Sequence, residues 1–148
     1  MTENILVAVA WPYANAEIHV GNLTGSYLPA DIFARYQRLR GRRVLMVSGS
    51  DSHGTPITVR ADAEGSTPYA VYQRFHAGFI DLFQQLGLTY DLYTSTHTNN
   101  HTRVAQHLFL ALKNNGFLYR ESQDQWYSTQ QQRFLPDRYV EGTCYICG

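Results

Sequence analysis

Ile5-Leu-Val-Ala-Val-Ala10 is an uninterrupted apolar run that ends at Trp11-Pro12 and leads, through a polar loop, to His19-Val20-Gly21-Asn22. Such a run is typical of a strand that is buried on both faces of a parallel sheet. From His19 onward the apolar residues recur at helical spacing. The chain therefore opens with a strand, a loop and a helix.

The helix that follows this loop is expected to carry one apolar face and one irregularity. Pro29 stands inside it and predicts a kink or irregular turn, and Gly41 is a typical stop signal. The residues expected on the apolar face are Leu23, Tyr27, Phe33, Tyr36 and Leu39.

A second strand and loop repeat this arrangement. Val44–Val47 reads as a buried strand, and Ser48-Gly-Ser-Asp51-Ser-His53-Gly54 follows it. Thr55-Pro56 predicts a helix with Thr55 as N-cap, and Thr67-Pro68 predicts another. The second of these has a strong apolar stripe, made of Tyr72, Phe75, Phe79, Leu82, Phe83 and Leu86.

The order strand, helix, strand, helix predicts an α/β fold with a parallel sheet. In such sheets ligands bind beyond the carboxyl ends of the strands. Both unusual loops, 11–22 and 48–55, begin where a predicted strand ends. We therefore expect them to face one crevice.

The pattern changes after a further predicted helix, 99–114, which ends at Asn115-Gly116. Three short segments beyond it look like strands of a mainly β subdomain, namely 117–119, 125–128 and 138–140. We place the boundary near Gly116, so that residues 1–116 form the first domain and 117–148 begin a second.

Composition narrows the class of protein. Of the 148 residues 44% are hydrophobic, which is enough for a packed core, and Lys plus Arg equals Asp plus Glu at 12 each. Because there is no basic excess, any RNA contact must be local or lie elsewhere.

We expect no signal peptide and no membrane span, and a reducing, cytoplasmic location. Cys144 and Cys147 look like metal ligands rather than a disulfide.

His19-Val20-Gly21-Asn22 has two interpretations. A helix N-terminus offers free N–H groups, a glycine admits a nucleotide close to the backbone, and His19 can donate to a phosphate oxygen. Alternatively, His19 only caps the helix and Gly21 only makes a turn. Asp51 likewise could bind a ligand or could merely sit near a helix start.

Together these motifs resemble methionyl-tRNA synthetases, which are class I enzymes. The family pattern is A-[LW]-P-Y-x-N, three residues, then H-[ILV]-G-[HN], and Ala10–Asn22 matches it. Its second loop, D-x-x-G-T-P, matches Asp51–Pro56. The segments 30–41 and 134–144 also match, so the resemblance covers nearly the whole chain. It implies the N-terminal half of a Rossmann-like doubly wound sheet, followed by the start of a small β-rich zinc-knuckle insertion.

The resemblance also implies roles for single residues. His19 and Asn22 would act on the ATP phosphates as methionine is activated, with Gly21 under the adenine. Asp51 would bind the α-ammonium group of methionine. The other methionine contacts would come from Ala10, Trp11 and Tyr13, and ATP, with its Mg²⁺, would be contacted by Pro12, His19, Gly21 and Asn22.

Two residues depart from the commoner pattern of the family. Asn22 replaces a second histidine, and it can donate a hydrogen bond but cannot carry charge. Trp11 stands where many bacterial members have leucine, so it can reshape the methionine pocket.

Cys144-Tyr-Ile-Cys147 is half of a four-ligand zinc site. In the resembled family a second pair follows shortly after, so zinc is expected in the full-length protein and is doubtful in this chain. The family's lysine-rich second signature has no match, because the only lysine is Lys113. We therefore expect an N-terminal fragment that is inactive alone, with most contacts to tRNA-Met outside it.

Two other functions stay open. One is a small nucleotidyltransferase of the H-x-G-H type, and the other is a non-catalytic, truncated paralogue that acts as a binding module. The basic cluster Arg35, Arg38, Arg40, Arg42 and Arg43 could contact RNA. We favour the simpler interpretation, in which these arginines complement a helix end and a solvated turn.

Overall fold

The computed structural model describes residues 3–130, 132–134 and 142. The chain has two compact units, Met1–His107 and Leu108–Gly148. The predicted boundary near Gly116, where an insertion would begin, stays a prediction.

A three-stranded parallel sheet forms the centre of the first unit. Its strands are β1 (Asn4–Ala8), β2 (Arg43–Ser50) and β3 (Leu92–Ser95), in the order β1-β2-β3. Ile5 pairs with Val44, and Val47 pairs with Leu92. The α/β class and the parallel sheet expected from the sequence are confirmed, and β2 is longer than the predicted strand.

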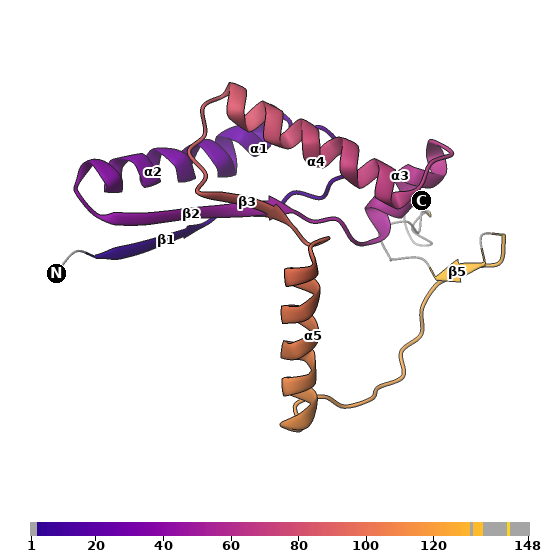
Figure 1. Ribbon diagram of the computed structural model, residues 1–148. Helices are drawn as coiled ribbons and strands as arrows, with labels where there is room; N and C mark the ends of the chain where they lie inside the picture. Colours follow the sequence, from indigo (N-terminus) through magenta and orange to yellow (C-terminus); the bar gives the residue numbers. More distant parts are fainter. Residues whose placement is uncertain (1–2, 131, 135–141, 143–148) are drawn as a thin grey trace. The chain divides into compact units, whose positions relative to one another are not determined.

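Helices α2 (Leu28–Leu39) and α4 (Pro68–Gln85) lie over the same face of this sheet (Figure 1). The core between helices and sheet includes Met46 of β2 and Phe79 and Phe83 of α4, all of them buried. Burial of such side chains is the main stabilising contribution to the fold. The predicted stripe on α4 is confirmed as a core face for Tyr72, Phe75, Phe79 and Phe83, whereas Leu86 lies beyond the helix and is 45% exposed.

The first helical stretch has three parts: α1 (Val20–Asn22), a π-helical turn η1 (Leu23–Tyr27) and α2. Pro29 is the second residue of α2 and has no N–H to donate within this continuous helical stretch. The predicted irregularity is thus confirmed as a π turn directly before the proline.

The predicted apolar face of α2 is wrong beyond Tyr27. Phe33 is 46% exposed and Leu39 is 87% exposed, whereas the residues that α2 buries are Asp31, Ala34 and Gln37. A π turn adds one residue to a helical turn, and one residue is a rotation of about 100°. The side chains after η1 therefore point in a different direction from the one that an uninterrupted 3.6-residue pattern predicts.

The next helix, α3 (Thr55–Ala63), begins differently from the prediction. Its N-cap is Gly54, at φ +106°, and Thr55 is its first residue. The prediction for α4 is confirmed, since Thr67 is its N-cap and accepts a hydrogen bond from the Ala70 N–H at 3.2 Å.

The helix α5 (Asn99–Asn114) has the bounds expected from the sequence. In the second unit β4 (Tyr127–Ser128) pairs antiparallel with β5 (Arg133–Phe134). The predicted strand at 117–119 is not formed, and the one at 138–140 lies outside the described residues. In the part of the chain that the structure describes, no helix is long and apolar enough to cross a membrane.

Candidate active site

The two loops that follow β1 and β2 are hydrogen-bonded to each other. The Asp51 N–H donates to the Pro12 carbonyl oxygen at 2.8 Å, and the Ala14 N–H donates to the Asp51 carbonyl oxygen at 2.9 Å. Tyr13 and Asp51 thereby form an isolated parallel bridge beyond the strands. These loops therefore share one edge of the sheet, and the crevice that they are expected to face stays a prediction.

His19 and Asn22 cap α1 reciprocally. The Asn22 N–H donates to His19 Nδ1 at 3.3 Å, and the His19 N–H donates to Asn22 Oδ1 at 3.3 Å. Since His19 Nδ1 accepts a hydrogen bond, the proton of the neutral ring is on Nε2. The cap therefore leaves His19 Nε2–H and the Asn22 side-chain NH₂ as donors at an exposed helix start.

Gly21 is needed for this arrangement. A Cβ atom at this position would stand 3.0 Å from both Cε1 and Nδ1 of His19. A side chain there would push the imidazole away from the Asn22 N–H. Gly21 thus keeps His19 folded back over the first turn, in addition to leaving the backbone open to a ligand.

Asp51 is half-buried, and its carboxylate is held within its own turn. Oδ1 accepts a hydrogen bond from the His53 N–H at 3.1 Å and lies 3.5 Å from Thr96 Oγ1. Asp51 lies four residues before α3 but does not cap it, because the N-cap is Gly54 and no side chain caps the helix.

Trp11 lies directly on the backbone of β2. A Cβ atom on Gly49 would be 2.8 Å from the Trp11 ring and 2.7 Å from the Thr94 carbonyl oxygen. The centroid of the indole also lies 6.4 Å from the centroid of the His101 ring. Ala10 and Tyr13 are exposed on the same loop. The loop residues predicted to contact the amino acid thus lie on one short segment. The Trp11 ring packs where a side chain of Gly49 would otherwise stand.

A polar cluster that the sequence did not predict joins β2, α4 and β3. Ser50 Oγ lies 2.8 Å from His76 Nδ1 and 3.1 Å from the Tyr93 hydroxyl. Burial lowers the pKa of the His76 imidazole and raises that of the Tyr93 phenol. The only available signal was the pair of serines, Ser48 and Ser50, in an otherwise apolar strand.

Three of the five arginines in the basic cluster form ion pairs. Arg35 pairs with Asp31 at 2.6 Å, Arg38 with Asp91 at 2.8 Å, and Arg42 with Glu3 at 2.9 Å. The Arg38 pair ties α2 to the segment before β3, the Arg35 pair lies within α2, and the Arg42 pair joins the turn after α2 to the residue before β1.

The metal prediction concerns residues outside the described part of the chain. Cys144 and Cys147 are among the residues without a described position. Among the described residues, no group of three His, Cys, Asp or Glu side chains could hold a metal ion. A zinc site therefore stays a prediction.

Two solved tRNA synthetase structures are similar to this chain. The methionyl-tRNA synthetase of Mycobacterium tuberculosis, in complex with methionyl-adenylate, superposes with a TM-score of 0.81 at 27% identity over 95% of this chain. LeuRS of Agrobacterium radiobacter K84, in a ternary complex with tRNA and LeuAMS, gives 0.80 at 27% identity, also over 95% of this chain. The matches cover 27% and 18% of those chains.

The family follows from the sequence. The family model described as tRNA synthetases class I (M) matches residues 5–148, and the chain belongs to this family. It is 62% identical to the methionine–tRNA ligase of Roseiflexus sp. (strain RS-1) and 58% identical to that of Thermomicrobium roseum, over 148 residues in both cases. The chain spans 25% of the length of each relative.

Proposed function

We propose that this chain supplies the first half of the adenylate-forming site of a methionine–tRNA ligase. The observation that carries the proposal is the pair of hydrogen bonds that joins Pro12 and Ala14 to Asp51. These bonds bring the loop that leads to His19 together with the only carboxylate of the second loop. The sequence relationship to methionine–tRNA ligases supports the choice of amino acid.

The reaction is an in-line displacement at phosphorus. A carboxylate oxygen of methionine attacks the α-phosphate of ATP, pyrophosphate leaves, and methionyl-adenylate is formed. No general base is required, because the carboxylate is already ionised. Catalysis then consists of positioning the reactants and stabilising the charge that develops on the phosphate oxygens.

His19 and Asn22 are assigned to the phosphates. Their cap leaves His19 Nε2–H and the Asn22 NH₂ as donors beside the free N–H groups of a helix start. Hydrogen bonds to a charged oxygen are stronger than those between neutral groups. Asn22 thus contributes a neutral donor where the commoner family pattern has histidine.

The amino acid is assigned to the opposite side of the same crevice. The Asp51 carboxylate binds the α-ammonium group, and Ala10, Trp11 and Tyr13 contact the rest of methionine. Pro12 and Gly21 contact ATP, which brings Mg²⁺ with its phosphates. The second substrate is tRNA-Met, bound mainly by parts of the relatives that this chain does not cover, and the cytoplasm stays the predicted location.

The test is methionine-dependent exchange of pyrophosphate into ATP, measured on the protein as it is expressed in its own cell. His19→Ala should lower the exchange rate by about 10²- to 10³-fold, because it removes a donor used in the transition state. Asp51→Asn should raise the KM for methionine. His107→Ala, an exposed histidine on α5, is the matched control and should leave exchange unchanged. Full exchange in the His19→Ala protein would contradict the proposal.

Calorimetry separates the two other functions. ATP binding that is independent of methionine would favour a small nucleotidyltransferase. Binding of neither ligand, together with absence of exchange, would favour a binding module.

A further inference from the structure

Thr96 is the first residue after β3, and its hydroxyl contacts the turn that carries Asp51. Its Oγ1 lies 2.8 Å from the Ser52 backbone nitrogen and 2.7 Å from Ser52 Oγ. It also lies 3.5 Å from Asp51 Oδ1. One hydroxyl thus reaches three polar atoms of two consecutive residues, 45 and 44 positions away in the sequence.

The hydrogens of this cluster can be assigned from its donors and acceptors. A threonine hydroxyl donates one hydrogen bond and accepts two. The Ser52 N–H must donate to Thr96, and the Ser52 hydroxyl can donate to it as well. When the Ser52 hydroxyl is the donor, the Thr96 proton points at Asp51 Oδ1, which gives the order Ser52 to Thr96 to Asp51.

The sheet fixes the position of Thr96. Its N–H donates to the Ser50 carbonyl oxygen at 3.1 Å, which extends the β2–β3 pairing by one bond. The preceding residue, Ser95, pairs with Ser50 and is buried, and its Oγ lies 2.8 Å from the Tyr72 hydroxyl on α4. The sheet therefore holds Thr96 in a fixed position beside the turn that carries Asp51.

We propose that Thr96 is a positioning residue that holds the Asp51 carboxylate in the orientation for binding the amino-acid ammonium group. The Thr96 hydroxyl and the His53 N–H both engage Oδ1, so Oδ2 is directed to the ligand. Preorganisation of a binding group by a second layer of hydrogen bonds saves the cost of ordering it when the ligand arrives. This inference rests on the proposed function.

The contact itself can be tested on the 148-residue chain without any ligand. Amide hydrogen exchange of Ser52 should become faster in Thr96→Val, because valine offers no acceptor to the Ser52 N–H. Thr96→Ser should restore slow exchange. Thr94→Val, an equally isosteric change on β3, is the control and should leave the Ser52 amide unaffected. Unchanged exchange in Thr96→Val would overturn the inference.

The functional consequence is tested by pyrophosphate exchange in the protein as it is expressed in its own cell. Thr96→Val should raise the KM for methionine by about tenfold, the equivalent of one hydrogen bond to a charged group. The kcat and the KM for ATP should change less than about twofold, and Thr96→Ser should restore the KM for methionine.

The two hypotheses fail in different ways. An unmodified protein without methionine-dependent exchange would overturn the proposed function, and this inference with it. Normal exchange combined with an unchanged methionine KM in Thr96→Val would overturn the inference alone. An equal rise of the KM values for ATP and methionine would also overturn the inference alone, because a role confined to Asp51 predicts a change for methionine only.

Discussion

The absence of a side chain at Gly49 leaves room for the Trp11 indole. The Trp11 indole occupies the space where a Cβ of Gly49 would stand, and the Thr94 backbone closes that space from the other side. Because a backbone carbonyl cannot move away as a flexible side chain can, an added methyl group must displace the indole or open the β2–β3 pairing.

We predict that Gly49→Ala lowers the free energy of unfolding by about 1–3 kcal/mol and shifts the Trp11 fluorescence emission. Gly78→Ala on α4 is the control, since nothing lies within 4 Å of its Cβ position. That change should stabilise the chain by about 0.5–1 kcal/mol, because alanine favours helix more than glycine does. Equal effects of both variants in denaturant unfolding would contradict this account.

Asp31 is a buried carboxylate that serves stability rather than chemistry. Burial raises the pKa of its carboxyl group, but hydrogen bonds from Thr89 and Arg35 outweigh burial and bring the pKa below its ordinary value of 3.8. The Thr89 N–H donates to Oδ1 at 2.7 Å and Arg35 Nε donates to Oδ2 at 2.6 Å. The carboxylate thus fastens α2 to the segment before β3.

The pH dependence follows from the sign of this shift. A carboxyl group whose pKa is lower in the folded state adds stability above its unfolded pKa, and loses it as the pH falls through the folded value. Asp31→Asn should therefore cost about 2 kcal/mol at pH 7 and less at acid pH. Unfolding by urea at several pH values measures this. A cost independent of pH would show that the charge of Asp31 is not involved.

At the scale of elements, the π turn η1 decides which side of α2 meets the sheet. It places Asp31 and Gln37 inward and leaves Phe33 and Tyr36 exposed. The same turn connects the His19–Asn22 cap to the body of the fold. One inserted residue thus sets both the packing of α2 and the direction of the helix start that is assigned to ATP.

The start of α4 offers a simpler test of an element. The Thr67 hydroxyl accepts a hydrogen bond from the Ala70 N–H at 3.2 Å and Pro68 occupies the first turn. We predict that Thr67→Ala lowers the free energy of unfolding by about 1 kcal/mol, while Thr67→Ser, which keeps the oxygen, costs less than half as much. Thermal unfolding of the two variants compares them directly. A serine variant as unstable as the alanine variant would exclude capping as the cause.

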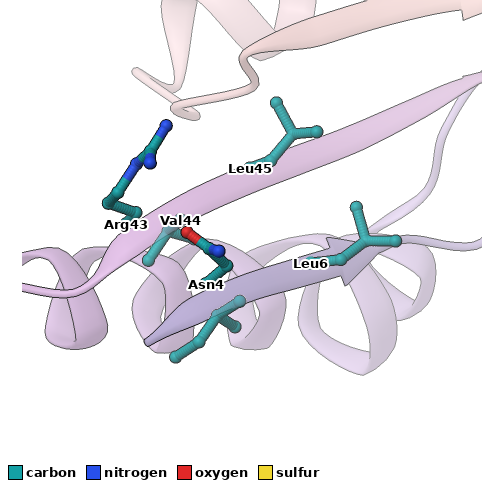
Figure 2. A pocket seen from close by; sticks show the side chains of 6 residues that line it. Asn4, Leu6, Arg43, Val44 and Leu45 are labelled. Carbon is teal, nitrogen blue, oxygen red and sulfur yellow. The ribbon is translucent and has the colours of Figure 1, made fainter. Parts of the chain in front are cut away.

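At the scale of the whole molecule, the sheet of the first unit has apolar side chains on its open face. Leu6 is 64% exposed and Leu45 is 51% exposed, and the two are paired in register on adjacent strands. Figure 2 shows both side chains on the same side of β1 and β2, beside a hollow that is also lined by Asn4 and Arg43. A contiguous apolar surface of this kind favours association.

We predict that the 148-residue chain self-associates as its concentration rises, and that Leu45→Lys shifts it toward the monomer. Leu39→Lys is the matched control, because Leu39 is 87% exposed on α2 and does not lie on the sheet. Sedimentation at several concentrations distinguishes the two variants. An equal effect of both would mean that added charge, rather than the sheet face, controls association.

The sequence alone determined the features of this protein that depend on residues close together along the chain. The stripe on α4 and the bounds of α5 follow from local periodicity, which a helix must show to bury one side. The apolar run at 5–10 predicts the strand β1, but burial on both of its faces is wrong, since Leu6 is 64% exposed. The family motifs around His19 and Asp51 lie at the carboxyl ends of parallel strands, so their meeting at one edge also followed from topology.

Only the tertiary structure decided the features that join distant residues. Thr96 reaches Asp51, and His76 reaches Ser50, because strand pairing and helix packing bring these residues together; apart from the two serines in β2, nothing in the local sequence signals it. The inward side of α2 was mispredicted for a related reason. A single extra residue in η1 rotates everything after it, and whether a helix adopts that turn is decided by the core it must fit.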